Sequence, residues 1–315
     1  MRVLEVVLLI AFLSVVPLLI SFHPYWMYVQ ILALIYAFLA CSWDLLAGYT
    51  GISTFSHGAF FGIGAYSSAI MTLGGVSPWL SLLLSPLVCA ALSGTLALIG
   101  FRLRGFYFAI VTLGFQEIVY RLLFIWKDVT GGPGGLTGIP LLPGVPDTKL
   151  AYYYLILVFF SVSLFIMFGI VNSRIGLILR SIRDDELLAK TRGVNTGKYK
   201  TFIFLISSFF PGLAGAFYCH YFAAISPEIM ELTTMVTILA STVVGGLASL
   251  VGPAIGAFMM LNLTEYLRVF SPYFRIMLIG LSIIAFRLFV PGGITSQMRR
   301  VVNHVNNYIK KAGKS

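Results

Sequence analysis

The sequence is dominated by apolar segments long enough to cross a lipid bilayer, and this feature restricts the chain to few folds. A transmembrane helix needs about 20 mostly apolar residues. Charged residues make up only 10% of the chain, whereas soluble domains carry about 25%. We therefore predict an all-α polytopic membrane protein, with residues 1–315 forming one transmembrane domain in a lipid bilayer. The shortage of charge argues against a soluble enzyme and against a nucleic-acid-binding protein.

Ten apolar stretches define the predicted spans, and two of them are unusual. The stretch at 52–73 is rich in glycine and the stretch at 234–245 is short. Either could form a re-entrant or broken helix instead of a simple crossing. We expect about ten transmembrane or re-entrant helices, near residues 3–20, 28–46, 52–73, 78–101, 106–126, 150–171, 201–222, 234–245, 251–267 and 273–290.

The basic residues divide unequally between the two sides that these spans define. Sixteen of the 21 Lys and Arg residues fall on the side that carries both termini and the loop at 172–200, and four fall on the other side. Cytoplasmic loops of membrane proteins collect Lys and Arg. We therefore expect both termini, this loop and the basic tail at 291–315 to be cytoplasmic.

A glycine-rich segment early in the chain is the first candidate for a translocation path. Glycines at helical spacing let helices approach closely in lipid, and irregular backbone at membrane depth must be buried in protein or line a water-filled cavity. A similar Gly-x-x-x-Gly pair occurs in the second half, and paired interruptions of this kind point to transporter binding regions. The alternative is tight packing without substrate contact. The candidates for either role are Ser56, His57, Gly58, Gly62 and Gly64, with Gly252 and Gly256 in the second half.

Ionisable residues within the predicted spans are few. Glu117 and Arg121 are four residues apart, so they can pair on one helix face. The pair could line the path, or it could be a structural ion pair near the membrane boundary. Asp44 and Glu265 are the other acids, and an ion-coupled transporter would have to build its ion site from these three carboxylates.

The loop at 172–200 has the pattern of two short amphipathic helices. Apolar residues Ile175, Leu179 and Ile182 recur at helical spacing, the acidic run 184–186 suits a helix N-terminus, and Gly193 suits a helix end. The acidic run argues against anionic lipid, so we expect the loop to dock a cytoplasmic partner. The chain has no catalytic cluster, no metal-spaced His/Cys set and no complete phosphate-binding loop. We therefore expect neither an enzyme nor a cofactor bound by this chain.

Several motifs in a fixed order resemble the branched-chain amino acid ABC transporter permeases of the LivM type. The resemblance covers about residues 43–293 and rests on GYTG…SHGAFFGIGAY, FYFAIVTLGFQEIV with TGGPGGLTGIP, RSIRDDELLAKTRGV, GGLASLVGPAIGA and VPGG. In such permeases a loop helix sits in a groove of the ATPase subunit. Leu187 and Leu188 depart from the alanine-rich core of that motif. The resemblance assigns the coupling role here to Arg183, Asp184, Asp185, Glu186, Ala189 and Gly193.

The resemblance also implies a function and a set of partners. It implies the membrane-spanning permease subunit of an ATP-driven importer for branched-chain or related amino acids, in the cytoplasmic (inner) membrane of a prokaryote. The partners would be a second permease subunit, two cytoplasmic ATP-binding subunits that hold ATP and magnesium, and an extracytoplasmic substrate-binding protein. Two alternatives stay open: a permease of the same family for urea or amides, and an ion-coupled secondary transporter that works without an ATPase.

Overall fold

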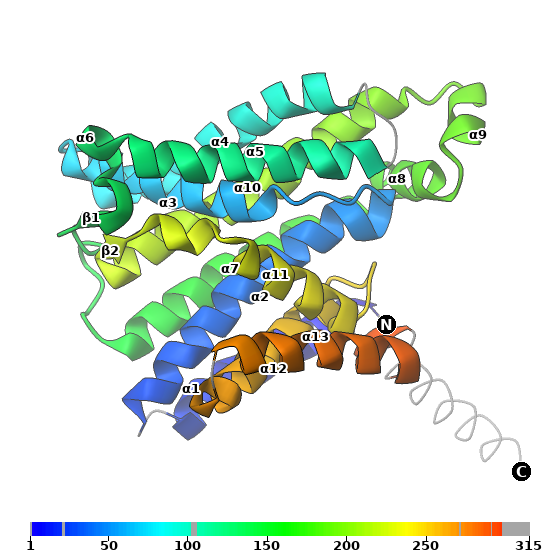
Figure 1. The fold of residues 1–315 in the computed structure, drawn as a ribbon. Coiled ribbons are helices and arrows are strands. Elements are labelled where there is room, and N and C mark those ends of the chain that lie inside the picture. Colours follow the sequence, from blue (N-terminus) through cyan, green and yellow to red (C-terminus); the bar gives the residue numbers. More distant parts are fainter. Residues whose placement is uncertain (1, 21–22, 102–105, 271, 291, 298–315) are drawn as a thin grey trace, which may run out of the picture.

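The computed structural model describes residues 2–20, 23–101, 106–270, 272–290 and 292–297, and these residues form a bundle that is almost entirely helical (Figure 1). The longer helices are α1 (Arg2–Ile20), α2 (Pro24–Thr50), α3 (His57–Leu73), α4 (Pro78–Gly100), α5 (Phe106–Ile125), α7 (Lys149–Asn172), α10 (Thr196–Phe222), α11 (Leu232–Gly245), α12 (Val251–Tyr266) and α13 (Pro272–Phe289). The short elements are α6 (Lys127–Thr130), η1 (Gly132–Gly134), β1 (Leu136–Thr137), α8 (Arg174–Asp184), α9 (Glu186–Thr191), β2 (Ala224–Ile225), η2 (Pro227–Met230) and η3 (Leu267–Val269). The predicted all-α polytopic fold is confirmed.

The helix boundaries follow from local chemistry. Helix α2 starts with a proline at its first position and ends at Gly51, whose φ of +74° is a left-handed conformation that glycine adopts without strain. The side chains of Ser77 and Thr148 accept hydrogen bonds from the first turns of α4 and α7. Five helices, α2, α4, α5, α7 and α10, are long and apolar enough to cross a membrane by length and composition.

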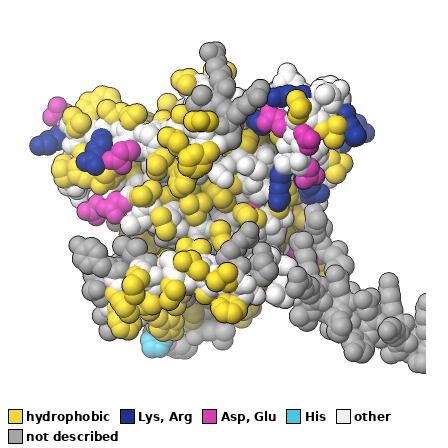
Figure 2. Space-filling model, turned by 45° about the vertical axis from the view of Figure 1, so that its right-hand side comes forward, with side chains coloured by type: hydrophobic (Ala, Val, Ile, Leu, Met, Phe, Trp, Pro, Cys, Tyr) yellow, Lys and Arg dark blue, Asp and Glu magenta, His cyan; other side chains and the backbone are white. Residues whose placement is uncertain are grey.

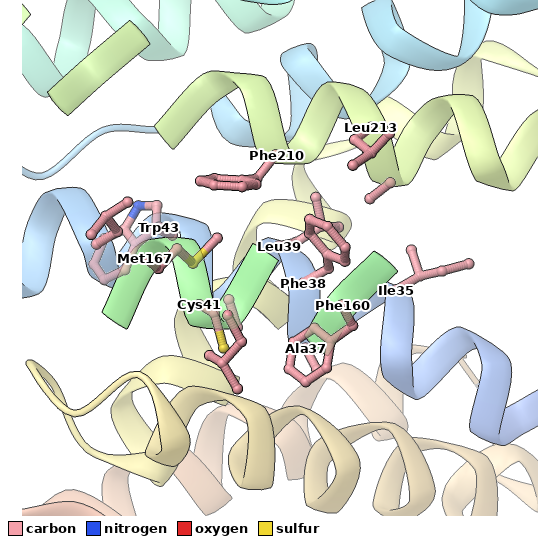
Figure 3. Packing of buried hydrophobic residues seen from close by; sticks show 14 of the residues in the cluster. Ile35, Ala37, Phe38, Leu39, Cys41, Trp43, Phe160, Met167, Phe210 and Leu213 are labelled. Carbon is pink, nitrogen blue, oxygen red and sulfur yellow. The ribbon is translucent and has the colours of Figure 1, made fainter. Parts of the chain in front are cut away.

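Helices α2 and α10 form the centre of the bundle. The most apolar window of α2 is 83% buried and that of α10 is 72% buried, whereas that of α5 is only 22% buried. The ring of Phe38 on α2 lies 5.9 Å from the Phe160 ring of α7 and 6.1 Å from the Phe210 ring of α10 (Figure 3). Because lipid tails are as apolar as these side chains, such close packing holds membrane helices together.

Two helices begin inside the bundle after a non-helical stretch. Helix α3 begins at His57, so residues 51–56 re-enter the bundle as a non-helical segment. Helix α11 has 14 residues, about 21 Å at 1.5 Å per residue, which is shorter than a ~30 Å hydrocarbon core. The two unusual spans are therefore a broken helix and a short helix, as the glycine content and the length indicated.

The non-helical segments that lead into α3 and α11 start at opposite ends of the molecule. We call the end that carries α8 and α9 the loop end, on the right in Figure 1, and the end that carries the β1–β2 pair the opposite end. Residues 51–56 follow α2 from the loop end, whereas residues 223–231 follow α10 from the opposite end. Helices α3 and α4 pack on α10, and α11 and α12 pack on α2. The two halves are thus arranged as an inverted pair, a plan common in transporters.

Both described ends of the chain lie at the loop end. Glu5 and Val6 of α1 line a small pocket with Tyr49 and Asn172, which are the final residues of α2 and α7. Residues 292–297 follow α13, and the Thr295 hydroxyl donates to the Gly245 carbonyl at 3.1 Å. The remaining residues of the predicted basic tail, 298–315, and Arg102 and Arg104 lie outside the described residues.

Candidate functional site

The first break, residues 51–56, is held by polar side chains from neighbouring helices. The Thr54 and Ser56 hydroxyls are fully buried and lie 2.7 Å apart. The indole of Trp43 donates to the Thr54 carbonyl at 2.8 Å, and the Phe55 amide donates to the Thr112 hydroxyl of α5 at 3.0 Å. The irregular backbone is therefore enclosed and hydrogen-bonded within protein, which is the condition for its presence at membrane depth.

The predicted path glycines after this break lie at close helix contacts. A Cβ on Gly58 would lie 3.0 Å from the amide oxygen of Gln116 on α5. At Gly62 a Cβ would overlap the Met230 side chain of η2, and at Gly64 it would overlap the backbone of α10. Gln116 also donates to the Met230 carbonyl at 3.2 Å. This arrangement fits the packing alternative for the three glycines.

His57 lies at the start of α3 and is fully buried. Neither of its ring nitrogens has a hydrogen-bond partner among the described residues. Buried polar atoms are normally satisfied, so this imidazole is the least satisfied of the predicted path residues. It and the buried, unpaired oxygen of Gln116 both lie near the first turn of α3.

The second break, residues 246–250, joins α11 to α12 and has a strained backbone. Ala248 and Leu250 have φ values of +58° and +56°, which side chains with a Cβ rarely adopt. The carboxylate of Asp44 on α2 accepts hydrogen bonds from the amide of Ala248 at 2.7 Å and from the amides of Ser249 and Leu250 at 3.2 Å. These three residues lie 204 to 206 positions after Asp44 in the chain. Asp44 is fully buried and therefore holds the non-helical backbone that precedes α12 from another helix.

The glycines predicted in the second half pack next to this break. A Cβ on Gly252 would overlap the Gly245 carbonyl, and a Cβ on Gly256 would overlap the Ser241 carbonyl of α11. The structure does not bring Gly252 and Gly256 together with Gly58 and Gly62, because the two pairs lie in α12 and α3 and contact different partners. Each pair serves a separate helix contact.

The three acids considered for an ion site already have partners. Asp44 binds three backbone amides, as above. Glu117 pairs with Arg121 at 2.6 Å, and Glu265 pairs with Arg268 at 3.0 Å. The side chains of Glu117 and Arg121 are 57% and 69% exposed, on a helix long enough to span a membrane. The structure therefore does not gather these acids into one site.

A polar cluster that the sequence analysis did not identify lies toward the opposite end. Ser68, Thr72 and Ser81 form a hydrogen-bonded group with His220, whose Nε2 lies 3.0 Å from the Ser68 hydroxyl. The Nδ1 of His220 lies 2.8 Å from the Pro140 carbonyl. Since a carbonyl only accepts, Nδ1 carries the proton and Nε2 accepts from a serine. The cluster ties α3, α4 and α10 to the loop that follows β1.

The loop at 172–200 folds into the two predicted helices, α8 and α9. The Asp185 side chain accepts the Leu188 amide at 2.9 Å and so caps α9, and Gly193 follows the helix with a φ of +84°. Asp184 is exposed and ends α8, while Ala189 is buried. The helix boundaries expected from the acidic run and from Gly193 are therefore present.

Glu186 is held within its own chain. Its carboxylate pairs with Lys190 at 3.0 Å and with Lys200 of α10, and it accepts from the Thr196 hydroxyl at 3.1 Å. Partial burial raises the pKa of Glu186, but the hydrogen bonds from Lys200 and Lys190 outweigh this effect and lower the pKa to about 2. Glu186 therefore fixes α9 against the first turn of α10.

Large apolar side chains are exposed on this loop. Leu187 is 73% exposed, Leu188 is 49% exposed and Leu177 of α8 is 64% exposed. Figure 2 shows that charged side chains gather toward the two ends of the molecule, with a mostly apolar surface between them. The leucines of α9 thus stand among charged residues, which is the surface expected of a protein interface.

Long apolar helices, interrupted inside the bundle by the non-helical residues 51–56 and 246–250, define a multi-pass membrane protein with the construction of a transporter. The family described as branched-chain amino acid transport system / permease component matches residues 25–286. The chain belongs to this family. Its members are permease components and not enzymes, as predicted.

Individual relatives agree with this assignment. The chain is 30% identical over 280 residues to the high-affinity branched-chain amino acid transport system permease proteins LivM of Salmonella typhimurium and Escherichia coli, and the match covers 80% of this chain and 66% of each relative. It is 24% identical over 254 residues to the permease protein LivH of Escherichia coli, covering 71% of this chain and 79% of that protein. It is also 28% identical over 174 residues to the guanosine ABC transporter permease protein NupQ of Bacillus subtilis, covering 50% of this chain and 54% of that protein. No solved structure matches the chain significantly.

Proposed function

We propose that the chain is one permease subunit of an ATP-driven importer for branched-chain or related amino acids in the cytoplasmic membrane of a prokaryote. Its partners are a second permease subunit, two cytoplasmic ATP-binding subunits that hold ATP and magnesium, and an extracytoplasmic substrate-binding protein. The observation that carries the proposal is the exposed apolar surface of α9, on a well-folded loop in a member of this permease family.

The surface of α9 suits a protein partner. Leu187 and Leu188 are both exposed, and Glu186 and Ala189 anchor the helix on its other face. An anchored helix loses little conformational entropy when a partner binds it. Leucines surrounded by charges match an interface with an apolar centre and a polar rim. We assign the ATP-binding subunit as the partner of the loop segment that contains Asp184, Asp185, Glu186, Ala189 and Gly193, with Leu187 and Leu188 at the contact, whereas the guanidinium of Arg183 binds the Gly48 carbonyl of α2.

The exposed pair Glu117–Arg121 supports a path or a subunit contact along α5. Ionised side chains are expensive in hydrocarbon, and within membranes they face a protein interior or water. Helix α5 is the least buried of the five long apolar helices. We assign its exposed face to the second permease subunit and the water-filled path between the two subunits. His57 and the glycines of α3 lie behind α5 and support the wall of that path.

The position of the termini supports an orientation with the loop end in the cytoplasm. Arg2 begins α1 at the loop end, and residues 292–297 end there as well. If the loop end faces the cytoplasm, the basic residues obey the positive-inside rule.

The substrate class comes from the relatives, most of which are named for branched-chain amino acids, while one is named for guanosine. Competition of guanosine with leucine for uptake distinguishes these two classes.

The test is recovery of ATP-binding subunits with the chain. The affinity-tagged chain is purified in a mild detergent from its native membranes, and we expect ATP-binding subunits to accompany it. The double variant Leu187→Glu, Leu188→Glu should lose them while still inserting in the membrane. Leu141→Glu is the matched control, because Leu141 is exposed in the loop after β1. Recovery of the chain without ATP-binding subunits, or full retention by the double variant, would contradict the proposal.

A further inference from the structure

The coupling loop contacts the transmembrane bundle through Arg183, the penultimate residue of α8. Its guanidinium Nη1 donates to the carbonyl of Gly48 in the last turn of α2. Its Cγ lies 3.5 Å from the position of a Cβ on Gly51, where α2 ends and the first break begins. Arg183 is otherwise exposed. One side chain of α8 therefore covers the exact point from which residues 51–56 re-enter the bundle.

The second break lies on the other side of the same turn of α2. A Cβ on Gly48 would overlap the Asp44 carboxylate and would lie 2.8 Å from the Ala248 amide. The carbonyl of Gly48 therefore contacts Arg183, and its Cα lies next to the Asp44 carboxylate and the Ala248 amide. Asp44 holds residues 248–250 through three hydrogen bonds.

The backbone that Asp44 holds is strained, so it needs that support. Residues with a Cβ at positive φ cost free energy and persist only where their surroundings fix them. Cys41 adds a hydrogen bond from its thiol to the Leu250 carbonyl at 3.0 Å. Both Cys41 and Asp44 lie on α2, so a shift of the last three turns of α2 would act directly on residues 246–250.

We infer that Arg183 and Asp44 are positioning residues that transmit motion of α8 to the two breaks. Arg183 makes one hydrogen bond to the bundle, from a side chain that is otherwise exposed to solvent. A partner that moves α8 would pull Arg183 from the Gly48 carbonyl and shift the end of α2. Asp44 would carry that shift to residues 246–250, and Gly51 would carry it to residues 51–56. This inference rests on the proposed docking of an ATP-binding subunit on α8 and α9.

The test measures the accessibility of the second break through a single introduced cysteine. Leu247 is exposed at the break and the three native cysteines are buried, so Leu247→Cys can be labelled selectively by a membrane-impermeant maleimide. Labelling rates are measured on the purified complex, without nucleotide and trapped with ATP and vanadate. Uptake per ATP hydrolysed is measured on the same complex in proteoliposomes.

Arg183→Gln should leave the ATP-binding subunits bound and hydrolysing ATP. The labelling rates of the nucleotide-free and the vanadate-trapped states should become about equal. Uptake per ATP should fall by about tenfold or more, which is the factor that corresponds to a hydrogen bond to a charged group. Arg183→Lys should restore part of both, since a lysine keeps the charge and one donor. Arg174→Gln is the control, because Arg174 is an exposed arginine in the first turn of the same helix.

Three results would overturn the inference. The first is a labelling rate at position 247 that does not change between the two states in the protein with Leu247→Cys alone. The second is a wild-type labelling ratio and wild-type coupling in Arg183→Gln. The third is loss of the ATP-binding subunits from Arg183→Gln, which would make Arg183 a docking residue. If Arg183→Gln fails to insert, full wild-type behaviour of Arg183→Ala with an intact complex decides against the inference. Absence of ATP-binding subunits from the unsubstituted complex would overturn the proposed function and this inference with it.

Discussion

Removal of the Asp44 carboxylate should destabilise the protein in a graded way. The carboxylate accepts three backbone amides, at 2.7 Å from Ala248 and 3.2 Å from Ser249 and Leu250. An asparagine has one acceptor oxygen, which can serve Ser249 and Leu250 together. Its NH₂ group then faces the Ala248 amide, donor against donor. Asp44→Asn thus retains at most two bonds, and Asp44→Ala retains none.

The size of the effect follows from the burial of this site. Asp44 is fully buried, and a hydrogen bond to a charged group contributes about 1.5–3 kcal/mol. We therefore expect Asp44→Asn to lower the free energy of unfolding by about 1.5–3 kcal/mol, and Asp44→Ala by about 4–9 kcal/mol, if the three bonds are additive. The second value is comparable to the whole stability of a typical domain, about 5–15 kcal/mol.

The native cysteines provide the assay. Cys41, Cys89 and Cys219 are all free and buried, so a thiol-reactive dye reports unfolding of the purified protein in detergent during a temperature ramp. Glu265→Gln is the matched control, because it removes a carboxylate whose partner is an arginine that is 61% exposed. We expect the melting temperature to fall in the order wild type and control, Asp44→Asn, Asp44→Ala. Equal melting of wild type and Asp44→Ala, or a lower value for Asp44→Asn than for Asp44→Ala, would refute the role of Asp44 in holding residues 248–250.

Three further predictions test the packing, the orientation and the loop. Gly62→Leu should abolish most uptake at normal expression, because its side chain would overlap Met230, whereas Gly169→Leu should not, since nothing lies within 4 Å of a Cβ there; uptake by membrane vesicles checks both. Ser181→Cys should resist an impermeant maleimide added outside intact cells and react after permeabilisation, because α8 is assigned to the cytoplasm; rapid labelling from outside would reverse the topology. The folded state lowers the pKa of Glu186 from 4.5 to about 2, so it favours the ionised form. The stabilisation from Glu186 is complete above about pH 4.5 and is lost as the pH falls toward 2. Amide hydrogen exchange in residues 186–200, corrected for intrinsic rates, should accelerate over that range in wild type, and Glu186→Gln should show fast exchange without this pH dependence.

Much of the fold could be predicted from the sequence because its signals are local. A run of apolar residues long enough to cross a membrane needs no knowledge of its neighbours, and the glycines of 48–58 and the brevity of 234–245 marked the two irregular spans. Asp185 and Gly193 likewise cap α9 through bonds within a few residues. The family motifs then supplied what these patterns could not, which was the class of transporter.

The contacts that organise the candidate site could not be predicted in this way. Asp44 binds residues more than 200 positions away, and nothing in its local sequence distinguishes an acceptor for the amides of a distant loop from an ion ligand. The acidic run suggested that Glu186 faces a partner, yet its carboxylate binds Lys200 across the turn between α9 and α10. The one sequence signal for Asp44 was an acid within an apolar helix, followed one turn later by Gly48.

The most direct test of the account is uptake by the reconstituted complex of this chain with its partner subunits. Proteoliposomes carry the complex, the binding protein and radiolabelled leucine are added outside, and ATP with magnesium is enclosed inside. The account predicts uptake that requires enclosed ATP, persists when ion gradients are collapsed, and is lost when the leucines of α9 are replaced by Leu187→Glu and Leu188→Glu. Uptake by this chain alone, driven by an ion gradient without ATP, would contradict it.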